Sequence, residues 1–275
     1  MIAPEVETAI IPLAGLATRM QPLARTVPKE MLPLGDRPLL HLVVEELVNG
    51  GVRHIVFVVG PRSEAIERYF HHLPDLDGAD EARSKDPIWA KTAQCSFSFV
   101  RQDEPCGVLD AVRRAYWMVR DDRPYIVHMG DSIIWHDSGL IKRMISCHRE
   151  TSSDATFAVG WRLPHYDTHS VAEPIDEAAP ADLAFEVRQT SRLQQQESKR
   201  APFVLGRYLL NGPMPPRGEL LMQVNRFGGL TPLMHNGESA SVMAVPLIGR
   251  ERLLGAGTLG EYHASWRQWL AERMA

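Results

Sequence analysis

A glycine-containing loop and two basic residues follow the first apolar run of the chain. The run "AIIPL" leads into "AGLATR", which holds Gly15 and Arg19, and Lys29 follows in "PKEMLP". Glycine lets backbone N–H groups come close to an anion, and such groups bind phosphate well when fixed positive charge lies beside them. A triphosphate, with several adjacent negative charges, is therefore the ligand that this combination favours. Taken by itself, the loop also fits a plain surface turn.

Two further polar residues stand directly after predicted strands. Asp131 follows the apolar run "YIVHMG", and Gln102 follows "CSFSFVR". Ligands of parallel α/β sheets collect at the carboxyl ends of the strands, so both residues stand where a ligand site is expected. The amide of Gln102 offers both a donor and an acceptor. The alternative role for Asp131 is that of a helix or turn cap.

The elements that must position these residues show a regular order along the chain. Short apolar runs alternate with longer amphipathic stretches, as in a sheet of parallel strands covered by helices. Residues 39–48 have apolar side chains near helical spacing before Gly50 and Gly51, and residues 54–60, "HIVFVVG", are typical of a strand buried on both faces. We predict an α/β fold with a Rossmann-like, mostly parallel sheet sandwiched by helices. The polar, proline-containing residues from about 162 to 200 predict a small β-rich region.

Composition excludes several classes of function. The 275 residues, 44% of them hydrophobic, can bury a sizeable core as one domain. A formal net charge of −4 gives no general attraction for nucleic acid. The three cysteines form no C-x-x-C pair, which favours a reducing cytoplasm, and no apolar run reaches the roughly 20 residues of a membrane span. We expect a cytoplasmic protein with neither a nucleic-acid nor a membrane partner.

The segment "PLAGLATRMQPLARTVPKEMLP" closely resembles the nucleotide-binding signature of bacterial sugar-1-phosphate nucleotidyltransferases, most of all the UTP–glucose-1-phosphate uridylyltransferases. Their signature is approximately G-x-G-T-R-x-x-P-x-T-K-x-x-P-K-E-M-L-P. The resemblance continues through "RPLLHLVVEELVNGGVRHIVFVVG", "VRQDEPCGVLDAV" and "HMGDSII", and it is weaker after about residue 135. The positions that match the signature in register are Gly15, Thr18, Arg19, Pro22, Pro28, Lys29, Glu30, Met31, Leu32 and Pro33.

The resemblance implies a reaction that joins a nucleoside triphosphate to a sugar-1-phosphate and releases pyrophosphate. UTP, or dTTP, and glucose-1-phosphate are the expected substrates, Mg²⁺ is the expected cofactor, and a homo-oligomer is the expected assembly. It also implies one domain over residues 1–275. Residues from about 8 to 135 would form its nucleotide-binding half, and residues from about 136 to 275 its sugar-binding half and C-terminal helix.

The resemblance also assigns roles to single residues. The loop from Gly15 to Arg19 would wrap the β- and γ-phosphates. Glu219 and Arg192 would contact the sugar phosphate. The implied catalytic residues are Arg19, Lys29 and Asp131, with Asp131 as the metal ligand. The implied nucleotide contacts are Ala14, Gly15, Thr18, Arg19, Lys29, Glu30, Gln102 and Gly107.

Departures from the family pattern leave a second hypothesis open. The second glycine of the loop is Ala17, the Thr-Lys pair is Ala24-Arg25, and no "E-K-P" motif is present. The family's second metal-binding carboxylate falls on Leu254 or Gly255. The alternative to a working enzyme is therefore a catalytically impaired nucleotide-binding paralogue that acts through a partner protein.

Overall fold

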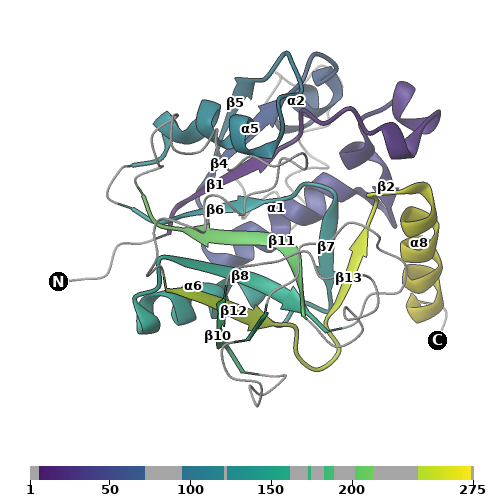
Figure 1. The fold of residues 1–275 in the computed structure, drawn as a ribbon. Coiled ribbons are helices and arrows are strands. Elements are labelled where there is room, and N and C mark those ends of the chain that lie inside the picture. Colours follow the sequence, from purple (N-terminus) through teal and green to yellow (C-terminus); the bar gives the residue numbers. More distant parts are fainter. Residues whose placement is uncertain are drawn as a thin grey trace.

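The computed structural model describes residues 6–71, 95–120, 123–161, 173–174, 183–188, 202–212 and 241–273. A large sheet crosses its centre, with helices on both faces (Figure 1). Within the described residues the sheet has nine strands, in the spatial order β5 (Ser96–Arg101), β4 (His54–Val59), β1 (Thr8–Pro12), β6 (Tyr125–His128), β11 (Phe203–Leu210), β8 (Ala155–Gly160), β12 (Val242–Pro246), β10 (Phe185–Arg188) and β9 (Glu173–Pro174).

The remaining elements lie around this sheet. The longer helices are α1 (Leu39–Gly50), α2 (Glu64–Phe70), α5 (Val108–Ala115), α6 (Leu140–Thr151) and α8 (Leu259–Arg273). Two small antiparallel ribbons pair β2 (Pro33–Leu34) with β3 (Arg37–Pro38), and β7 (Ser132–Trp135) with β13 (Arg252–Gly255). Short 3₁₀ turns are η1 (Thr18–Met20), η2 (Leu23–Arg25), η3 (Lys29–Met31) and η4 (Tyr116–Met118). None of the helices within the described residues has the length and apolar character needed to cross a bilayer.

The sheet confirms the predicted α/β class. Strands β5, β4, β1 and β6 are parallel neighbours, and β12 is parallel to β8. Strand β11 runs antiparallel between β6 and β8, so the sheet is mixed. Because β5, β4, β1 and β6 run in one direction, the loops that follow them all leave from the same edge.

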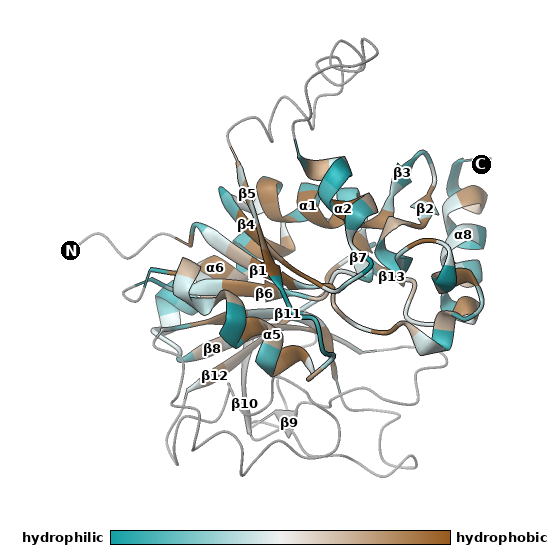
Figure 2. Ribbon diagram, turned by 90° about the horizontal axis from the view of Figure 1, so that it is seen from above, coloured by the Kyte–Doolittle hydropathy of each residue, from teal (hydrophilic) through white to brown (hydrophobic). Residues whose placement is uncertain are grey.

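Strand β4 is buried on both faces, as its continuous apolar sequence predicts. Ile55 and Phe57 join the core that contains α1 and α6, while Val56 and Val58 join the core that contains α5. Alternate residues of a strand point to opposite faces, so a strand covered by helices on both sides must be apolar throughout. Figure 2 shows this as continuous hydrophobic colour along the central strands.

Helix α1 ends where the sequence predicts. Gly51 follows the helix with φ 109°, and its N–H donates to the carbonyl oxygens of Leu47 and Val48. Glycine is favoured there because a side chain disfavours a positive φ.

The predicted C-terminal helix is also present, as α8 beside β2 and β13 (Figure 1). Tyr262 Oη and Trp266 Nε1 both donate to the Pro33 carbonyl oxygen, at 2.7 and 3.0 Å. The Trp269 ring lies against Gly35, where a Cβ would come within 2.3 Å of a ring carbon. The aromatic residues of α8 therefore fasten the end of the chain to the segment that follows Lys29.

A buried ion pair joins α1 to the middle of the sheet. Arg207 of β11 is fully buried, and its Nε and one terminal nitrogen donate to the two carboxylate oxygens of Glu46 at 2.9 and 3.0 Å. The other terminal nitrogen reaches Ser132 Oγ at 2.9 Å, and His128 Nε2 lies 3.3 Å from Glu46 Oε1. The arginine lowers the pKa of Glu46 far enough to outweigh burial, so this carboxyl stays ionised.

Gly206 allows Arg207 to enter this network. Its φ is 73°, and it lies where the pairing of β11 with β8 is irregular. The Gly206 carbonyl oxygen accepts from Met129 N at 2.9 Å. The irregular strand and the ion pair together hold the segment between β6 and β7, which contains Asp131.

Replacement of Arg207 by methionine should lower the free energy of unfolding by about 3 to 5 kcal/mol, because it leaves a buried glutamate without its counter-ion. Replacement of Glu46 by glutamine should be similarly costly. The double variant should lose clearly less free energy of unfolding than the sum of the two single losses, since neither charge is then buried without its partner. Urea unfolding of the four proteins measures this, and additive losses would contradict a coupled pair.

Candidate functional site

A close ion pair lies at the edge where the parallel strands end. Lys29 Nζ donates to Asp131 Oδ2 at 2.5 Å, and the side chains are 14% and 22% exposed. Burial alone would lower the pKa of Lys29 and raise that of Asp131, but the pairing outweighs it. The lysine pKa is therefore raised and the aspartate pKa is lowered, so both groups are charged. Lys29 comes from η3 and Asp131 from the turn after β6, two segments far apart in the sequence.

Gly130 explains how Asp131 reaches this place. A Cβ at Gly130 would come within 2.3 Å of Leu13 Cδ2 and 3.1 Å of Ile11 Cγ2. Because a side chain at position 130 would have to displace the buried Leu13 side chain, glycine lets the "MGDS" turn pass close to the loop that follows β1. The sequence pairs a strand-end aspartate with a glycine for this steric reason.

Glu30 lies beside the ion pair and is almost completely buried. Its Oε1 is 3.9 Å from Lys29 Nζ, and 5% of the residue is exposed. Burial raises the pKa of Glu30 to about 7, and nearby Lys29 offsets only part of that effect. The group is therefore balanced between its neutral and charged forms near neutral pH.

The loop after β1 leaves two predicted residues exposed. Thr18 and Arg19 face solvent, and Met20, fully buried, anchors the loop behind them. Arg19 makes no hydrogen bond or ion pair with any other residue that the structure describes, although it is close enough to Asp131 to lower the pKa of that carboxyl. A cation left unpaired beside an ion pair is available to an anionic ligand.

Glycine at position 15 is not required by the fold. Gly15 has no positive φ, and a Cβ there would meet no heavy atom within 4 Å. The left-handed residue of this loop is Ala17, with φ 49° and ψ 39°. Open space at Gly15 is what a ligand close to the backbone would need. Ala17, where the resembling pattern has glycine, holds a conformation that costs an alanine roughly 1 kcal/mol.

A pocket of about 480 Å³ opens beside this loop. Ala14, Gly15, Lys29 and Glu30 line it, so the structure brings these four predicted residues together. The pocket also has basic side chains that the sequence analysis did not select, namely Arg25, Arg62 and Arg68.

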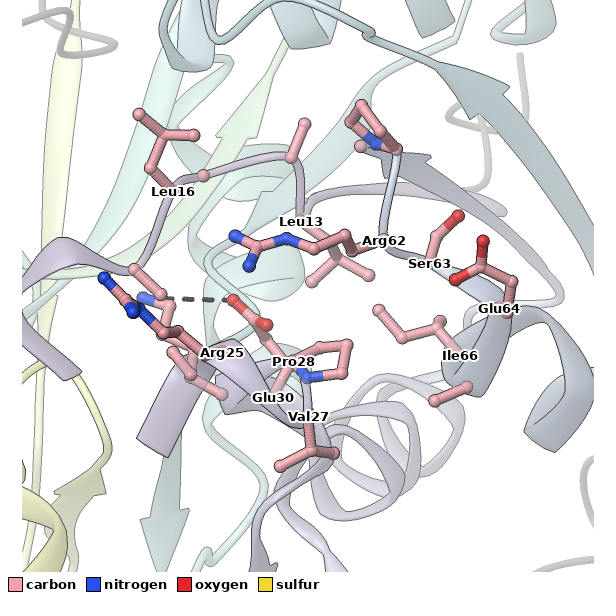
Figure 3. Close-up of a pocket in the computed structure, with 18 of the residues that line it drawn as sticks. Leu13, Leu16, Arg25, Val27, Pro28, Glu30, Arg62, Ser63, Glu64 and Ile66 are labelled. Carbon is pink, nitrogen blue, oxygen red and sulfur yellow. Dashed lines mark ion pairs between the residues drawn. The ribbon is translucent and has the colours of Figure 1, made fainter. Parts of the chain in front are cut away.

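Arg62 is the clearest of these additions. It projects into the pocket near the Glu30 carboxyl group, and Arg25 lies to one side (Figure 3). Arg101 fixes the turn that carries Arg62, because it donates to the Gly60 carbonyl oxygen at 3.1 Å and to Ser63 Oγ at 3.0 Å. The same signal that selected Gln102 and Asp131, a polar residue just after a buried strand, could have found Arg62.

Gln102 lies at the same edge, directly after β5, and is 3% exposed. Its Nε2 donates to the Gly107 carbonyl oxygen at 3.1 Å and to Asp110 Oδ2 at 2.7 Å. Gly107 has φ 90° and ψ 172°, a conformation that is essentially restricted to glycine. Gln102 and Gly107, both predicted, are therefore in direct contact with each other.

Some predicted residues lie apart or cannot be placed. Thr18, Arg19, Gln102, Gly107 and Asp131 do not line the 480 Å³ pocket, although all follow strands that end at the same edge. The two predicted sugar-phosphate residues, Glu219 and Arg192, lie outside the described residues.

The chemistry of the donors fits a magnesium ion only in part. Within the described residues, no cluster of three or more His, Cys, Asp or Glu side chains could hold a metal. Mg²⁺ is commonly bound through one or two carboxylates together with substrate phosphates, and Asp131 supplies one ionised carboxylate. The residues therefore fit an ion that is held mainly by a phosphate ligand, not a preformed protein cage.

The register of β13 identifies which residue lies beside Asp131. Gly255 pairs with Ser132, and the N–H of the next residue, Ala256, donates to the Asp131 carbonyl oxygen at 2.8 Å. Leu254 pairs with Ile133 and is 2% exposed in the core. Asp131 therefore lies opposite Ala256, and Gly255, opposite Ser132, is the nearer along the ribbon of the two positions that the sequence left open.

Comparison with known proteins identifies the family. Residues 8–167 match the family described as "Nucleotidyl transferase", and the chain belongs to this family of nucleotidyltransferases. It is 32% identical over 212 residues to the UTP–glucose-1-phosphate uridylyltransferase of Staphylococcus epidermidis, covering 75% of this chain and 72% of that protein. It is 30% identical over 214 residues to the enzyme of the same name from Staphylococcus haemolyticus, with the same coverage of 75% and 72%.

Solved structures show the same fold. The UTP-bound UGPase from Acinetobacter baumannii matches with a TM-score of 0.80 and 23% identity over 98% of this chain and 94% of that chain. A UDP-glucose pyrophosphorylase complexed with UDP-glucose matches with a TM-score of 0.79 and 21% identity, over 98% and 100%. The resemblance stated from the sequence motifs is confirmed.

The pKa of Glu30 predicts a pH dependence of stability. Because the folded protein holds this proton up to about pH 7 and the unfolded chain releases it near pH 4.5, the contribution of the neutral carboxyl is full below 4.5. It is lost as pH rises from 4.5 to about 7. Glu30→Gln stays neutral, so its free energy of unfolding relative to wild type should rise by about 1 to 3 kcal/mol over that range.

Urea unfolding without ligands or metal, at several pH values from 5 to 8, measures this difference. Taking the difference cancels the titration of histidines that both proteins share. Glu64→Gln, at an exposed glutamate of the same pocket, is the matched control. If the difference in free energy of unfolding between Glu30→Gln and wild type is the same at every pH, the raised pKa of Glu30 is contradicted.

Proposed function

We propose that this nucleotidyltransferase binds UTP at the carboxyl edge of β1, β4, β5 and β6, and joins it to a sugar-1-phosphate, with glucose-1-phosphate as the favoured substrate. The observation that supports this most is the charged group at that edge. Lys29 and Asp131 are ionised beside an unpaired Arg19, next to a loop with open space at Gly15. Relatives about 30% identical that are named for this reaction support the same substrates.

The residues suggest a separate contact with the phosphates for each part of the site. The backbone from Gly15 to Arg19 would cradle the β- and γ-phosphates, with the Arg19 guanidinium adding positive charge. Lys29 would exchange its contact with Asp131 for a phosphate oxygen near the reacting phosphorus. Thr18 and Ala14 would contribute contacts from the same loop. In the free protein the Lys29–Asp131 pair neutralises both charges, so no isolated charge is buried before the ligand arrives.

The chemistry needs no protein nucleophile. A phosphate oxygen of the sugar-1-phosphate attacks the α-phosphorus of UTP in line, and the bond from that phosphorus to the bridging oxygen of pyrophosphate breaks. Positioning and charge stabilisation by Lys29 and Arg19 then carry most of the catalysis. Mg²⁺, when bound through Asp131 and the phosphates, would supply further stabilisation of the developing negative charge.

Other parts of the expected enzyme stay proposals. Glu219 and Arg192 remain the candidates for the sugar phosphate. The division at about residue 135 into a nucleotide-binding and a sugar-binding half, the homo-oligomeric state and the cytoplasmic location are proposed on the sequence alone.

Pyrophosphate release from the purified chain tests the function. With Mg²⁺ and glucose-1-phosphate we expect release with UTP, with dTTP as its competitor, and none when either substrate is omitted. Lys29→Met should abolish release, because the charge that neutralises the phosphates is gone. Absence of release under every condition by a protein that still binds UTP would instead support the catalytically impaired paralogue.

Position 255 gives a sharper prediction about the metal. We propose that the second carboxylate of the family is missing at Gly255, so Gly255→Asp should lower the Mg²⁺ concentration for half-maximal release by about threefold or more. Leu254→Asp is the matched control. It should lower the free energy of unfolding by about 3 kcal/mol or more without improving Mg²⁺ use, since it buries a carboxylate in the core.

An unchanged Mg²⁺ requirement in a folded Gly255→Asp protein would contradict the missing carboxylate and point to another acid. Glu251 is a poor candidate, because Arg143 and Ser138 already occupy its oxygens at 2.6 to 3.0 Å. Glu261 is a better one, because burial raises its pKa and it lies close enough to Arg19 and Asp131 for their charges to act on it as well.

A further inference from the structure

The orientation of the Gln102 side-chain amide is set by its neighbours. Both groups in contact with Nε2 are hydrogen-bond acceptors, a backbone carbonyl oxygen of Gly107 at 3.1 Å and a carboxylate oxygen of Asp110 at 2.7 Å. An amide nitrogen has two N–H groups, and here each has an acceptor. The donor half of the amide is thus engaged within the protein.

The opposite orientation is strongly disfavoured. Turning the amide over would place Gln102 Oε1 against the same two acceptors, so two hydrogen bonds would be replaced by two repulsive contacts. For a side chain that is 3% exposed, such unpaired polar contacts are costly. The two acceptors therefore determine which end of the amide is the nitrogen and which is the oxygen.

Asp110 is held in place mainly by its helix. It lies in the first turn of α5, where negative charge is favoured by the helix dipole. Arg114, one turn later, donates from Nε to the same Asp110 Oδ2 at 2.6 Å, but its side chain is 43% exposed, so this surface contact adds little. As a charged acceptor, Asp110 constrains Gln102 more strongly than the neutral carbonyl of Gly107 does.

The carbonyl oxygen of the amide, Oε1, is left for a ligand. Gln102 Oε1 makes no hydrogen bond to any residue that the structure describes, and it is not a fully buried atom. What Gln102 offers to a ligand at this edge is therefore an acceptor. The sequence led us to expect both a donor and an acceptor, but the donor half is already in use.

We propose that Asp110 is a positioning residue that determines base specificity, because it holds Gln102 so that its carbonyl oxygen meets the base. This rests on the proposed function, with the base of the nucleotide lying at Gln102. The acceptor pairs with a base that carries a ring N–H at its Watson–Crick edge, as uracil and thymine do at N3. Cytosine and adenine present an unprotonated ring nitrogen at the equivalent place, and they are rejected by repulsion between two acceptors.

UTP and CTP are matched probes, because they have the same phosphates and ribose and differ at N3 and the exocyclic group. Calorimetric titration of the intact protein with each should show UTP binding tighter than CTP by about tenfold or more. In Asp110→Asn the ratio should fall below about threefold. The fall should come mainly from tighter CTP binding, because the asparagine amide can donate to Gln102 Oε1 and stabilise the reversed orientation.

Tighter binding of CTP is a result that general damage to the fold would not produce. Arg114→Ala is the matched control. It removes the other partner of Asp110 Oδ2 and leaves the contact with Gln102, so the ratio should stay within about twofold of wild type. Should Asp110→Asn fail to fold, Asp110→Ala supplies the test, with a ratio that also falls because only Gly107 then orients the amide.

The outcomes separate this inference from the function on which it rests. A wild type that binds neither nucleotide would contradict both. UTP preference that persists unchanged in folded Asp110→Asn, or that is lost equally in Arg114→Ala, would overturn the role of Asp110 and leave the proposed reaction intact.

Discussion

The ion pair between Lys29 and Asp131 is the interaction on which the site depends. It joins η3, which follows β1, to the turn that follows β6, and it does so where both side chains are largely shielded from water. Either charge alone would be costly to hold there, so each makes the other possible. Glu30 shares this environment, and its raised pKa shows how strongly the surroundings disfavour a charge without a close partner. A ligand that brings both phosphate and metal could take over both contacts. The negative phosphate would replace Asp131 beside Lys29, and the positive metal would replace Lys29 beside Asp131.

The position of Asp131 depends in turn on the buried ion pair in the middle of the sheet. Arg207, Glu46 and Ser132 connect β11, α1 and β7, and Gly206 accepts from Met129 in the segment just before Asp131. This hydrogen-bonded network lies under the turn that carries Asp131, and such a network can hold a side chain within the small tolerance that the proposed binding and catalysis require. Strand β11 therefore supports the turn that carries Asp131 although none of its residues lines the 480 Å³ pocket.

Much of this could be predicted from the sequence, because parallel strands place their carboxyl ends together. Gln102 and Asp131 were selected by their positions after predicted strands, and Lys29 by its charge beside the glycine-containing loop. The resemblance added Glu30, and the structure places all four at one edge. Arg62 was missed although it follows β4 in the same way, since no motif marked it. The shared placement has one physical basis, the common direction of β1, β4, β5 and β6.

Other features depend on contacts that spacing does not reveal. Which of Leu254 and Gly255 lies nearer to Asp131 depends on the pairing of β13 with β7, and a shift of one residue turns a side chain to the opposite face of the ribbon. The orientation of Gln102 depends on Asp110, whose carboxylate reaches it only after the chain has turned at Gly107.

Affinity for UTP tests the central claim most directly. Calorimetric titration with Mg²⁺ should show one UTP bound per chain, and Arg19→Ala should weaken binding by about 1.5 to 3 kcal/mol, the range for charge-assisted hydrogen bonds. Arg19 makes no hydrogen bond or ion pair with a described residue, and its charge favours ionised Asp131 while it disfavours charged Lys29, so its removal should change thermal stability little. Arg149→Ala, at an exposed arginine near the end of α6, should bind UTP as the wild type does. No UTP binding by the wild type, or equal affinity in wild type and Arg19→Ala, would contradict a phosphate site at this edge.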